Sequence, residues 1–195
     1  MLYPINIELE NINITVIGGG EVAYRKCKNF IEFGKKVKVV SKSYIKEFEE
    51  IKEHLDMIID EYKEKYIKYS YIVVGATDNK EINKKIGIYC RENGKLVNIV
   101  DDKQISNYTV PSYIKRGDLL ISVSTNGKSP SLSSKIKKEI SKTYDDSYED
   151  YIRLLGETRE LVLSKIENKL EKRKVLNSLV NLTLEELKLE KEKYN

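Results

Sequence analysis

The chain has 195 residues, of which 40% are hydrophobic and 34% are charged, so it is long enough for a globular domain with a substantial core and an appendage. Its 35 basic and 31 acidic residues leave a net charge of only +4, too balanced to indicate a nucleic-acid partner from bulk charge alone. No run is long enough to cross a membrane, the N-terminus does not resemble a leader, and the two cysteines form no metal-binding or disulfide pattern, so we expect a cytoplasmic protein with no membrane partner.

Strand-like and helix-like segments alternate over residues 1–112. Runs rich in Val and Ile predict strands at 13–17, 36–41, 57–60, 71–75 and 96–100. Helical spacing predicts helices at 21–33, 43–55 and 80–93, with a short turn at 62–68. Alternation at this spacing implies parallel strands joined by crossover helices, so we expect an α/β domain whose sheet is covered on both faces.

The pattern changes after residue 112. A strand is predicted at 119–124 and a helix over 131–141, and residues from 146 onward are helical and heavily charged. We therefore expect two further domains, a small one over 113–145 and a C-terminal helical one over 146–195.

The most specific local pattern joins the first predicted strand to the first predicted helix. The apolar run at 14–17 ends in three glycines, and the helix begins at Glu21. Gly18 permits a sharp turn, Gly20 allows a pyrophosphate to approach bare backbone, and the small Ala23 lets the helix pack close to the strand. Together with the free N–H groups of the helix N-terminus, this pattern predicts a dinucleotide site in a Rossmann-type domain.

One part of the dinucleotide pattern is missing. A carboxylate that binds the ribose is expected at the end of the second strand, but Val40 is followed by Ser41, Lys42 and Ser43. Either serine would bind a ribose hydroxyl more weakly. Lys42 would suit the 2′-phosphate of NADP, or it is an ordinary solvated loop residue. These residues alone therefore do not decide between NAD and NADP.

The buried strand at 71–75 leads into Ala76, Thr77 and Asp78. Ligands of open α/β sheets bind outside the carboxyl ends of the strands, so we expect Thr77 to border the nicotinamide half of a cofactor. Asp78 precedes a predicted helix and is expected to be its N-cap.

Asp101 and Asp102 follow the predicted strand at 96–100. A carboxylate at this edge of the sheet would serve as a general base. The alternative is that the two aspartates only form a turn.

A loop rich in hydroxyl groups precedes the helix at 131–141. It contains Thr125, Lys128 and Ser129, and Ser129 is expected to cap the helix with Pro130 at its first position. A basic, hydroxyl-rich helix N-terminus suits an anion, although an ordinary capped helix with a solvated basic face would have the same sequence.

Taken in order, these motifs resemble the precorrin-2 dehydrogenase family, the dehydrogenase module of sirohaem synthases. The resemblance covers nearly the whole chain. No single motif identifies the family, but the full set of motifs in this order is specific for it. It departs from the family at Gly75, where the family usually has Ala, and at Asn107-Tyr-Thr-Val110. The matching segments are Tyr3-Pro4-Ile5, Val16 to Lys26, Gly75 to Asp78 with Asn83, Asn98 to Asp101, Val110 to Ser112, Ser124 to Pro130, Leu155 to Arg159 and Glu171 to Arg173.

The resemblance implies an oxidoreductase that oxidises precorrin-2 to sirohydrochlorin with NAD, in sirohaem or cobalamin biosynthesis. It implies a homodimer whose Rossmann domain, at 1–112, is followed by a dimerisation domain at 113–145 and a helical domain at 146–195. It places the key aspartate of the family on Asp101. Its NAD contacts fall on Glu21, Val22, Lys42 and Ser43, in addition to Gly18, Gly20 and Thr77.

The substrate would be a tetrapyrrole with many carboxylates, which basic and hydroxyl side chains attract. Its expected contacts are Asn98, Arg116, Thr125, Lys128 and Ser129, with Lys115 and Lys135 completing a basic rim. No metal-ligand cluster is predicted. Insertion of Fe²⁺ or Co²⁺ into the product stays open, and Asp101 is the residue nominated for it.

An alternative of a different class is an NAD(H)-sensing regulator that binds DNA through its basic helical tail. Such a protein is expected to place a helix-turn-helix ahead of the nucleotide fold. Here the chain starts almost directly on the first strand, and acids alternate with the lysines of the tail, as in Glu185 to Lys193. We therefore expect no nucleic-acid partner.

Overall fold

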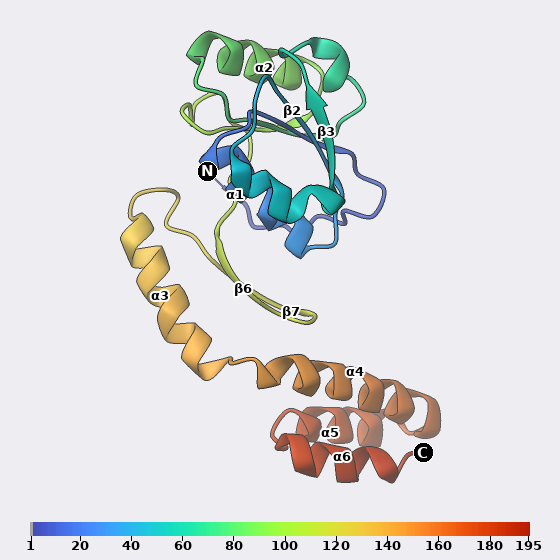
Figure 1. Cartoon of the computed structure of the whole chain (residues 1–195). Helices are drawn as coiled ribbons and strands as arrows, with labels where there is room; N and C mark the ends of the chain where they lie inside the picture. The colour runs from blue at the N-terminus through green and yellow to red at the C-terminus, as the bar shows by residue number, and fades with distance from the viewer. Residues whose placement is uncertain (1) are drawn as a thin grey trace. The chain divides into compact units, whose positions relative to one another are not determined.

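The computed structural model describes residues 2–195, which divide into a compact unit ending at Val110 and a second unit beginning at Pro111 (Figure 1). The second unit thus begins slightly before the predicted boundary at residue 112, because Ser112 is already the first residue of a strand.

A five-stranded sheet forms the centre of the first unit, in the order β3-β2-β1-β4-β5. All its strand pairs are parallel, which confirms the predicted α/β class. The strand order reverses between β1 and β4, and such a reversal opens a crevice at the carboxyl ends of the strands. The strands are β1 (Ile14–Ile17), β2 (Val37–Ser41), β3 (Leu55–Ile59), β4 (Ile72–Gly75) and β5 (Leu96–Ile99).

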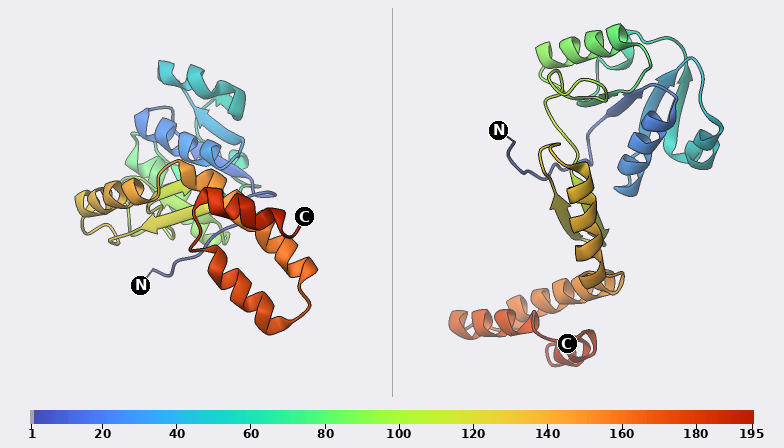
Figure 2. Two further views of the ribbon diagram at one scale, coloured as in Figure 1. Left: turned by 90° about the horizontal axis from the view of Figure 1, so that it is seen from below. Right: turned by 90° about the vertical axis from the view of Figure 1, so that its left-hand side faces the viewer.

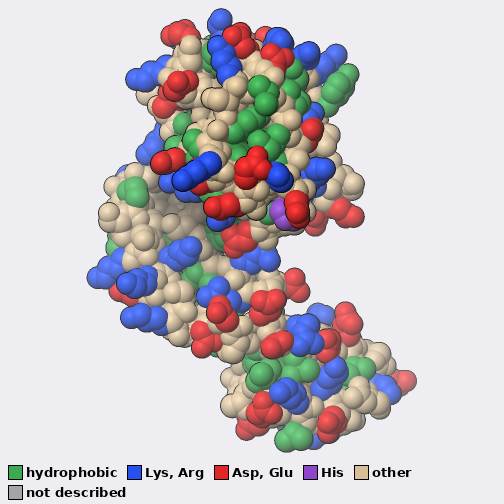
Figure 3. Space-filling model, viewed as in Figure 1, with side chains coloured by type: hydrophobic (Ala, Val, Ile, Leu, Met, Phe, Trp, Pro, Cys, Tyr) green, Lys and Arg blue, Asp and Glu red, His purple; other side chains and the backbone are tan. Residues whose placement is uncertain are grey.

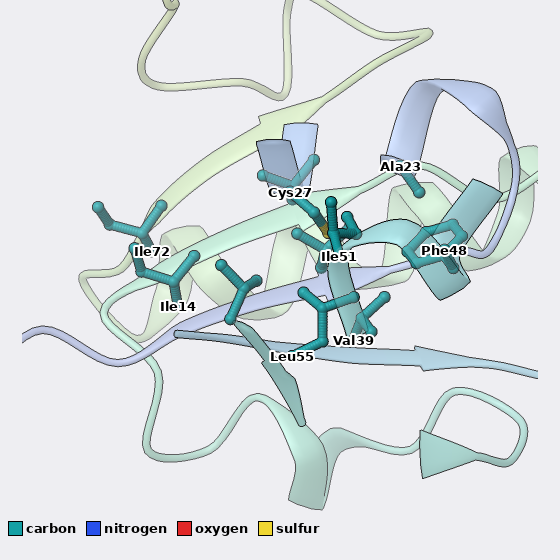
Figure 4. Packing of buried hydrophobic residues seen from close by; sticks show 11 residues of the cluster. Ile14, Ala23, Cys27, Val39, Phe48, Ile51, Leu55 and Ile72 are labelled. Carbon is teal, nitrogen blue, oxygen red and sulfur yellow. The ribbon is translucent and has the colours of Figure 1, made fainter. Parts of the chain in front are cut away.

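Helices cover both faces of this sheet (Figure 2). On one face, α1 (Glu21–Glu32) and the 3₁₀ helix η1 (Lys46–His54) contribute Ala23, Cys27 and Phe48 to a core that Figure 4 shows from close by. On the other face, α2 (Lys80–Glu92) packs through Ile86 and Cys90, near the short 3₁₀ helix η2 (Glu64–Tyr66). The central strands β1 and β4 are therefore buried on both sides, as the apolar run at 71–75 predicts for β4.

The segment predicted as a helix at 43–55 is a 3₁₀ helix in the structure. Its apolar side chains Ile45, Phe48 and Ile51 recur every three residues, and all three pack in the first core. A 3₁₀ helix has three residues per turn, so this spacing places them on one face.

The second unit begins with a hairpin of β6 (Ser112–Arg116) and β7 (Leu119–Val123). Only β7 was predicted. The turn between the strands is Gly117-Asp118, in which Gly117 has a φ of +54°. A two-residue turn of this composition is a hairpin signal that joins β6 to β7 in a separate antiparallel ribbon.

The rest of the second unit is helical, as predicted. It consists of α3 (Pro130–Thr143), α4 (Ser147–Lys165), α5 (Lys169–Leu179) and α6 (Leu184–Glu192). The last three helices share a small core of Leu154, Leu179 and Leu187. Within residues 2–195, no helix has both the length and the apolar character needed to cross a membrane.

Candidate functional site

The glycine turn lies at the carboxyl edge of the sheet, between the loops that follow β2 and β4. Gly18 has a φ of +130°, and a Cβ there would lie 2.2 Å from the carbonyl oxygen of Ala76. A Cβ on Gly19 would lie 2.0 Å from the carbonyl oxygen of Ser43. Side chains are therefore excluded at both positions, and the turn closes tightly against both loops.

Gly20 differs from the two glycines before it. A Cβ at this position would meet no atom within 4 Å, so the backbone faces open space. Gly20 is also the N-cap of α1 and has no side chain to bind the free N–H groups of the first turn, which begins with Glu21 and Val22. Open space in front of unpaired donors and the positive end of a helix dipole fits a pyrophosphate.

The ribose end of the predicted site holds a carboxylate that sequence reasoning missed. Glu61 lies after β3, and its carboxylate is 2.7 Å from the Lys42 ammonium. The hydrogen bond to Glu61 raises the pKa of Lys42, and the same bond lowers the pKa of Glu61. Asp78 adds a second, more distant negative charge that raises the pKa of Lys42 further.

The loop that carries Glu61 is held in place. The N–H of Asp60 donates to the carbonyl of Ser41 at 3.1 Å, which ties the end of β3 to the end of β2. The Asp60 carboxylate accepts hydrogen bonds from the Lys63 ammonium and from the Tyr66 hydroxyl. These bonds hold the pKa of Asp60 well below its usual range, and the bond from Lys63 has the larger effect. The loop after β3 thus brings an acid beside the end of β2, through a strand register that the sequence alone does not show.

A hydrogen-bonded network joins the loop after β4 to the end of β5. Asn83 of α2 accepts from the N–H of Thr77 at 3.2 Å and donates to its carbonyl at 3.0 Å. The same amide donates to the Oδ1 of Asp101 at 3.0 Å. Because Gly18 packs against Ala76 and Thr77, the glycine turn, Thr77 and Asp101 lie side by side.

Of two other aspartates, Asp102 forms the turn that the sequence offered as an alternative, and Asp78 does not have its expected role. Asp102 accepts hydrogen bonds from the N–H groups of Gln104 and Ile105, at 2.8 and 3.2 Å, and so forms the turn after β5. The prediction that Asp78 caps α2 is wrong. Asn79 is the N-cap, because it lies one residue closer to the helix and its side chain accepts from the N–H groups of Glu81 and Ile82.

In the second unit, Thr125 and Ser129 close the loop before α3. The Thr125 hydroxyl donates to the carbonyl of Ser129 at 3.0 Å, and the Ser129 hydroxyl accepts from the N–H of Leu132 at 3.2 Å, as expected of an N-cap. Pro130 has no N–H, so fewer free donors are left here than at α1. Lys128 is exposed. Ser129 and Pro130 thus form the capped start of α3 that the sequence predicts.

The structure does not bring Arg116 to this loop. Arg116 pairs with Leu119 at the turn of the hairpin, whereas Ser112 pairs with Val123 at the other end, where the loop to α3 begins. Four residue steps of about 3.4 Å each separate the two ends. The Nε of Arg116 lies 3.0 Å from the Asp146 carboxylate, in an ion pair whose geometry is not that of a hydrogen bond. Within this unit Arg116 and Lys128 therefore lie at opposite ends of the hairpin and do not form one basic cluster.

Asn98 lies on β5, and its side-chain N–H₂ donates to the carbonyl of Tyr108 at 3.3 Å. The bond ties the segment after residue 103 back to the sheet, and the side chain stays half-buried.

Comparisons with known proteins agree with this geometry. Residues 5–112 match a family model described as putative NAD(P)-binding, and residues 116–143 match one described as sirohaem biosynthesis protein central. A precorrin-2 dehydrogenase of Methanosarcina barkeri is 32% identical over 89% of this chain and 80% of its own length.

The chain belongs to the precorrin-2 dehydrogenase family.

Other members of this precorrin-2 dehydrogenase family show the same extent of match. The precorrin-2 dehydrogenase of Priestia megaterium is 29% identical over 92% of this chain and 90% of its own length. A solved structure of "SirC, precorrin-2 dehydrogenase" superposes with a TM-score of 0.80 at 29% identity and covers 99% of this chain and 100% of that one. The siroheme synthase of Ruthia magnifica is longer, since a match to 85% of this chain covers only 35% of it.

For this precorrin-2 dehydrogenase homologue, the pairing of Lys42 with Glu61 predicts a preference for NAD⁺ over NADP⁺. A 2′-phosphate would meet the Glu61 carboxylate and a lysine that is already paired. We expect Glu61→Gln to raise the affinity for NADP⁺ relative to NAD⁺ by up to about fivefold, since exposed charge pairs contribute at most about 1 kcal/mol. Fluorescence titration with both dinucleotides measures this ratio, and Glu64→Gln, at the start of η2 three residues further on, is the matched control. An unchanged ratio in Glu61→Gln would contradict the assignment.

Proposed function

We propose that this protein oxidises precorrin-2 to sirohydrochlorin with NAD⁺, and that Asp101 is the base of the reaction. One observation supports the assignment most strongly. The Asp101 carboxylate is joined through Asn83 to Thr77, whose loop packs against the glycine turn. An exposed carboxylate therefore lies beside the site that fits the dinucleotide.

The bound nicotinamide supplies the acceptor for the hydride that leaves the tetrapyrrole. The residues of this chain provide the rest. Asp101 accepts the proton that is lost from the substrate with the hydride, so the two hydrogens removed are both accounted for. Gly18 and Gly20 admit the pyrophosphate, Glu21 and Val22 present backbone N–H groups to it, and Thr77 borders the nicotinamide. Ser43, whose carbonyl packs on Gly19, lies with Lys42 at the ribose.

For the substrate we propose contacts from Asn98, Thr125, Lys128 and Ser129. The supporting feature is charge: α3 contains four lysines and one glutamate, and Figure 3 shows Lys and Arg side chains along the region of α3. Carboxylates of a tetrapyrrole would bind such cations through charge-assisted hydrogen bonds. Arg116 is left out, because it pairs with Asp146 at the other end of the hairpin.

The function is tested by incubating the protein with precorrin-2 and NAD⁺ and following the absorption spectrum. Parallel samples with Fe²⁺ or Co²⁺ test metal insertion, an activity that the family resemblance leaves open and for which Asp101 is the nominated residue. Among residues 2–195 no group of three or more His, Cys, Asp or Glu side chains is placed to hold a metal ion. Absence of a sirohydrochlorin spectrum would reject the proposed oxidation.

We also propose that the protein is a homodimer whose dimerisation domain is residues 113–145, followed by the helical domain at 146–195. The ribbon of β6 and β7 has only two strands, and both of its edges are unpaired within the described residues. A second copy would cover this ribbon and bury more of the half-exposed Leu119 and Ile121. Light scattering at micromolar concentrations is expected to give twice the chain mass, and a monomeric mass throughout that range would contradict the proposal.

We further propose that the protein works in the cytoplasm. Cys27 and Cys90 are both free and buried, and burial raises the pKa of each thiol to about 12. Such thiols are unreactive and suit a reducing compartment.

A further inference from the structure

Asn83 is a buried polar residue on the apolar face of α2. Its side chain is 1% exposed, and Ile86, Gly87 and Cys90 of the same helix are also buried. A buried amide without partners is costly, so its hydrogen bonds account for its presence on this face.

All four hydrogen-bonding positions of the Asn83 amide are occupied. Its oxygen accepts from the N–H of Thr77 at 3.2 Å and from the Thr77 hydroxyl at 2.7 Å. Its nitrogen donates to the Thr77 carbonyl and to the Oδ1 of Asp101, each at 3.0 Å. An amide has two donor hydrogens and two acceptor lone pairs, so its capacity is filled.

The orientation of this amide follows from Thr77. The backbone N–H of Thr77 can only donate and its carbonyl can only accept, so the amide oxygen must face the first and the nitrogen the second. The remaining N–H of Asn83 then has to point at Asp101. Within residues 2–195 this is the one hydrogen bond that the Asp101 side chain receives. The Asp101 residue is exposed to solvent.

We propose that Asn83 is a positioning residue that fixes the Asp101 carboxylate relative to the loop of Thr77, which borders the dinucleotide site. This inference rests on the proposed role of Asp101 as base. The amide occupies Oδ1 and leaves Oδ2 for the proton, and it orients the carboxylate without placing a charge beside it. A neutral donor of this kind restricts the position of the carboxylate and leaves the acceptor oxygen accessible.

The test combines Asn83→Ala with Asp101→Ala in a double-mutant cycle. Single-turnover rates are measured with enzyme in excess of precorrin-2, so that slow reactions remain measurable. We expect Asn83→Ala to lower the rate about ten- to a hundredfold in the wild-type background, since a misplaced group costs that much. In the Asp101→Ala background the same change should alter the rate less than about threefold, because the residue acts through Asp101.

Asn79→Ala is the matched control. It removes the N-cap of the same helix, four residues earlier, and should lower the thermal midpoint of the protein. The single-turnover rate and the Kd of NAD⁺ should stay at their wild-type values. Equal rate losses in Asn79→Ala and Asn83→Ala, or losses at Asn83 and Asp101 that multiply, would overturn the positioning role. If Asp101→Ala itself keeps its rate, the proposed base is wrong, which is a separate outcome.

Discussion

The Gly20→Asp variant is expected to lose NAD⁺ binding and to keep its fold. The position has open space for a side chain and an extended backbone, with φ −90° and ψ −175°. Asp is a favourable N-cap residue, so the thermal midpoint of the free protein should not fall. In the complex, however, the new carboxylate would meet the pyrophosphate at close range. Two like charges at about 4 Å repel by several kcal/mol at a protein surface, so we expect at least a hundredfold weaker Kd.

Gly19→Ala is the comparison variant, because at this neighbouring glycine we expect the substitution to lower stability. Its Cβ would lie 2.0 Å from the carbonyl oxygen of Ser43, so the backbone must shift. We expect a loss of about 1–3 kcal/mol of unfolding free energy, typical of overpacking. Calorimetry measures the binding of both variants, and thermal denaturation measures their stability. A folded Gly20→Asp variant that binds NAD⁺ with unchanged affinity would refute the placement of the pyrophosphate.

Asp101→Ala is expected to abolish most of the dehydrogenase rate while NAD⁺ binding persists. The carboxylate is exposed at the end of β5 and is held by one hydrogen bond from Asn83, so its loss removes little of the fold. General acid–base groups contribute on the order of a hundred- to ten-thousandfold, and we expect a loss in that range. The kcat for precorrin-2 oxidation measures it.

The neighbouring Asp102 provides the internal control. It accepts two backbone N–H bonds in the turn after β5, so Asp102→Ala should cost about 1 kcal/mol of stability and leave kcat nearly unchanged. Equal rate losses in the two variants, or an Asp101→Ala variant with more than about a tenth of the wild-type rate, would reject Asp101 as the base.

The parts of the site that the sequence predicted are those encoded by local patterns. The turn at Gly18 and Gly20 needs a strand, bare backbone and a helix in succession, and all three are adjacent in the chain. The α/β class follows in the same way from alternating segments. Ser129 and Pro130 begin α3 as predicted, because capping involves only neighbouring residues.

The parts that were missed depend on contacts between distant segments. Glu61 reaches Lys42 only because β3 pairs with β2 in a register that sets Ile59 beside Ser41. Asn83 reaches Asp101 across 18 positions of sequence. Arg116 seemed close to the loop before α3 only because the strand β6 and its hairpin pairing were not foreseen. For Arg116 the Gly117-Asp118 turn was an available hairpin signal, whereas the contacts of Glu61 and Asn83 have no local signal in a single sequence.

In the proposed reaction precorrin-2 loses two hydrogens, one of them as hydride to NAD⁺. The most direct measurement is the stoichiometry of the reaction under anaerobic conditions, with NADH and sirohydrochlorin quantified in the same sample. We expect NADH and sirohydrochlorin to form in equal amounts, both to require NAD⁺, and both to form at least about a hundredfold more slowly with Asp101→Ala. Sirohydrochlorin formed without NADH, or no consumption of precorrin-2 by a folded protein that binds NAD⁺, would contradict it.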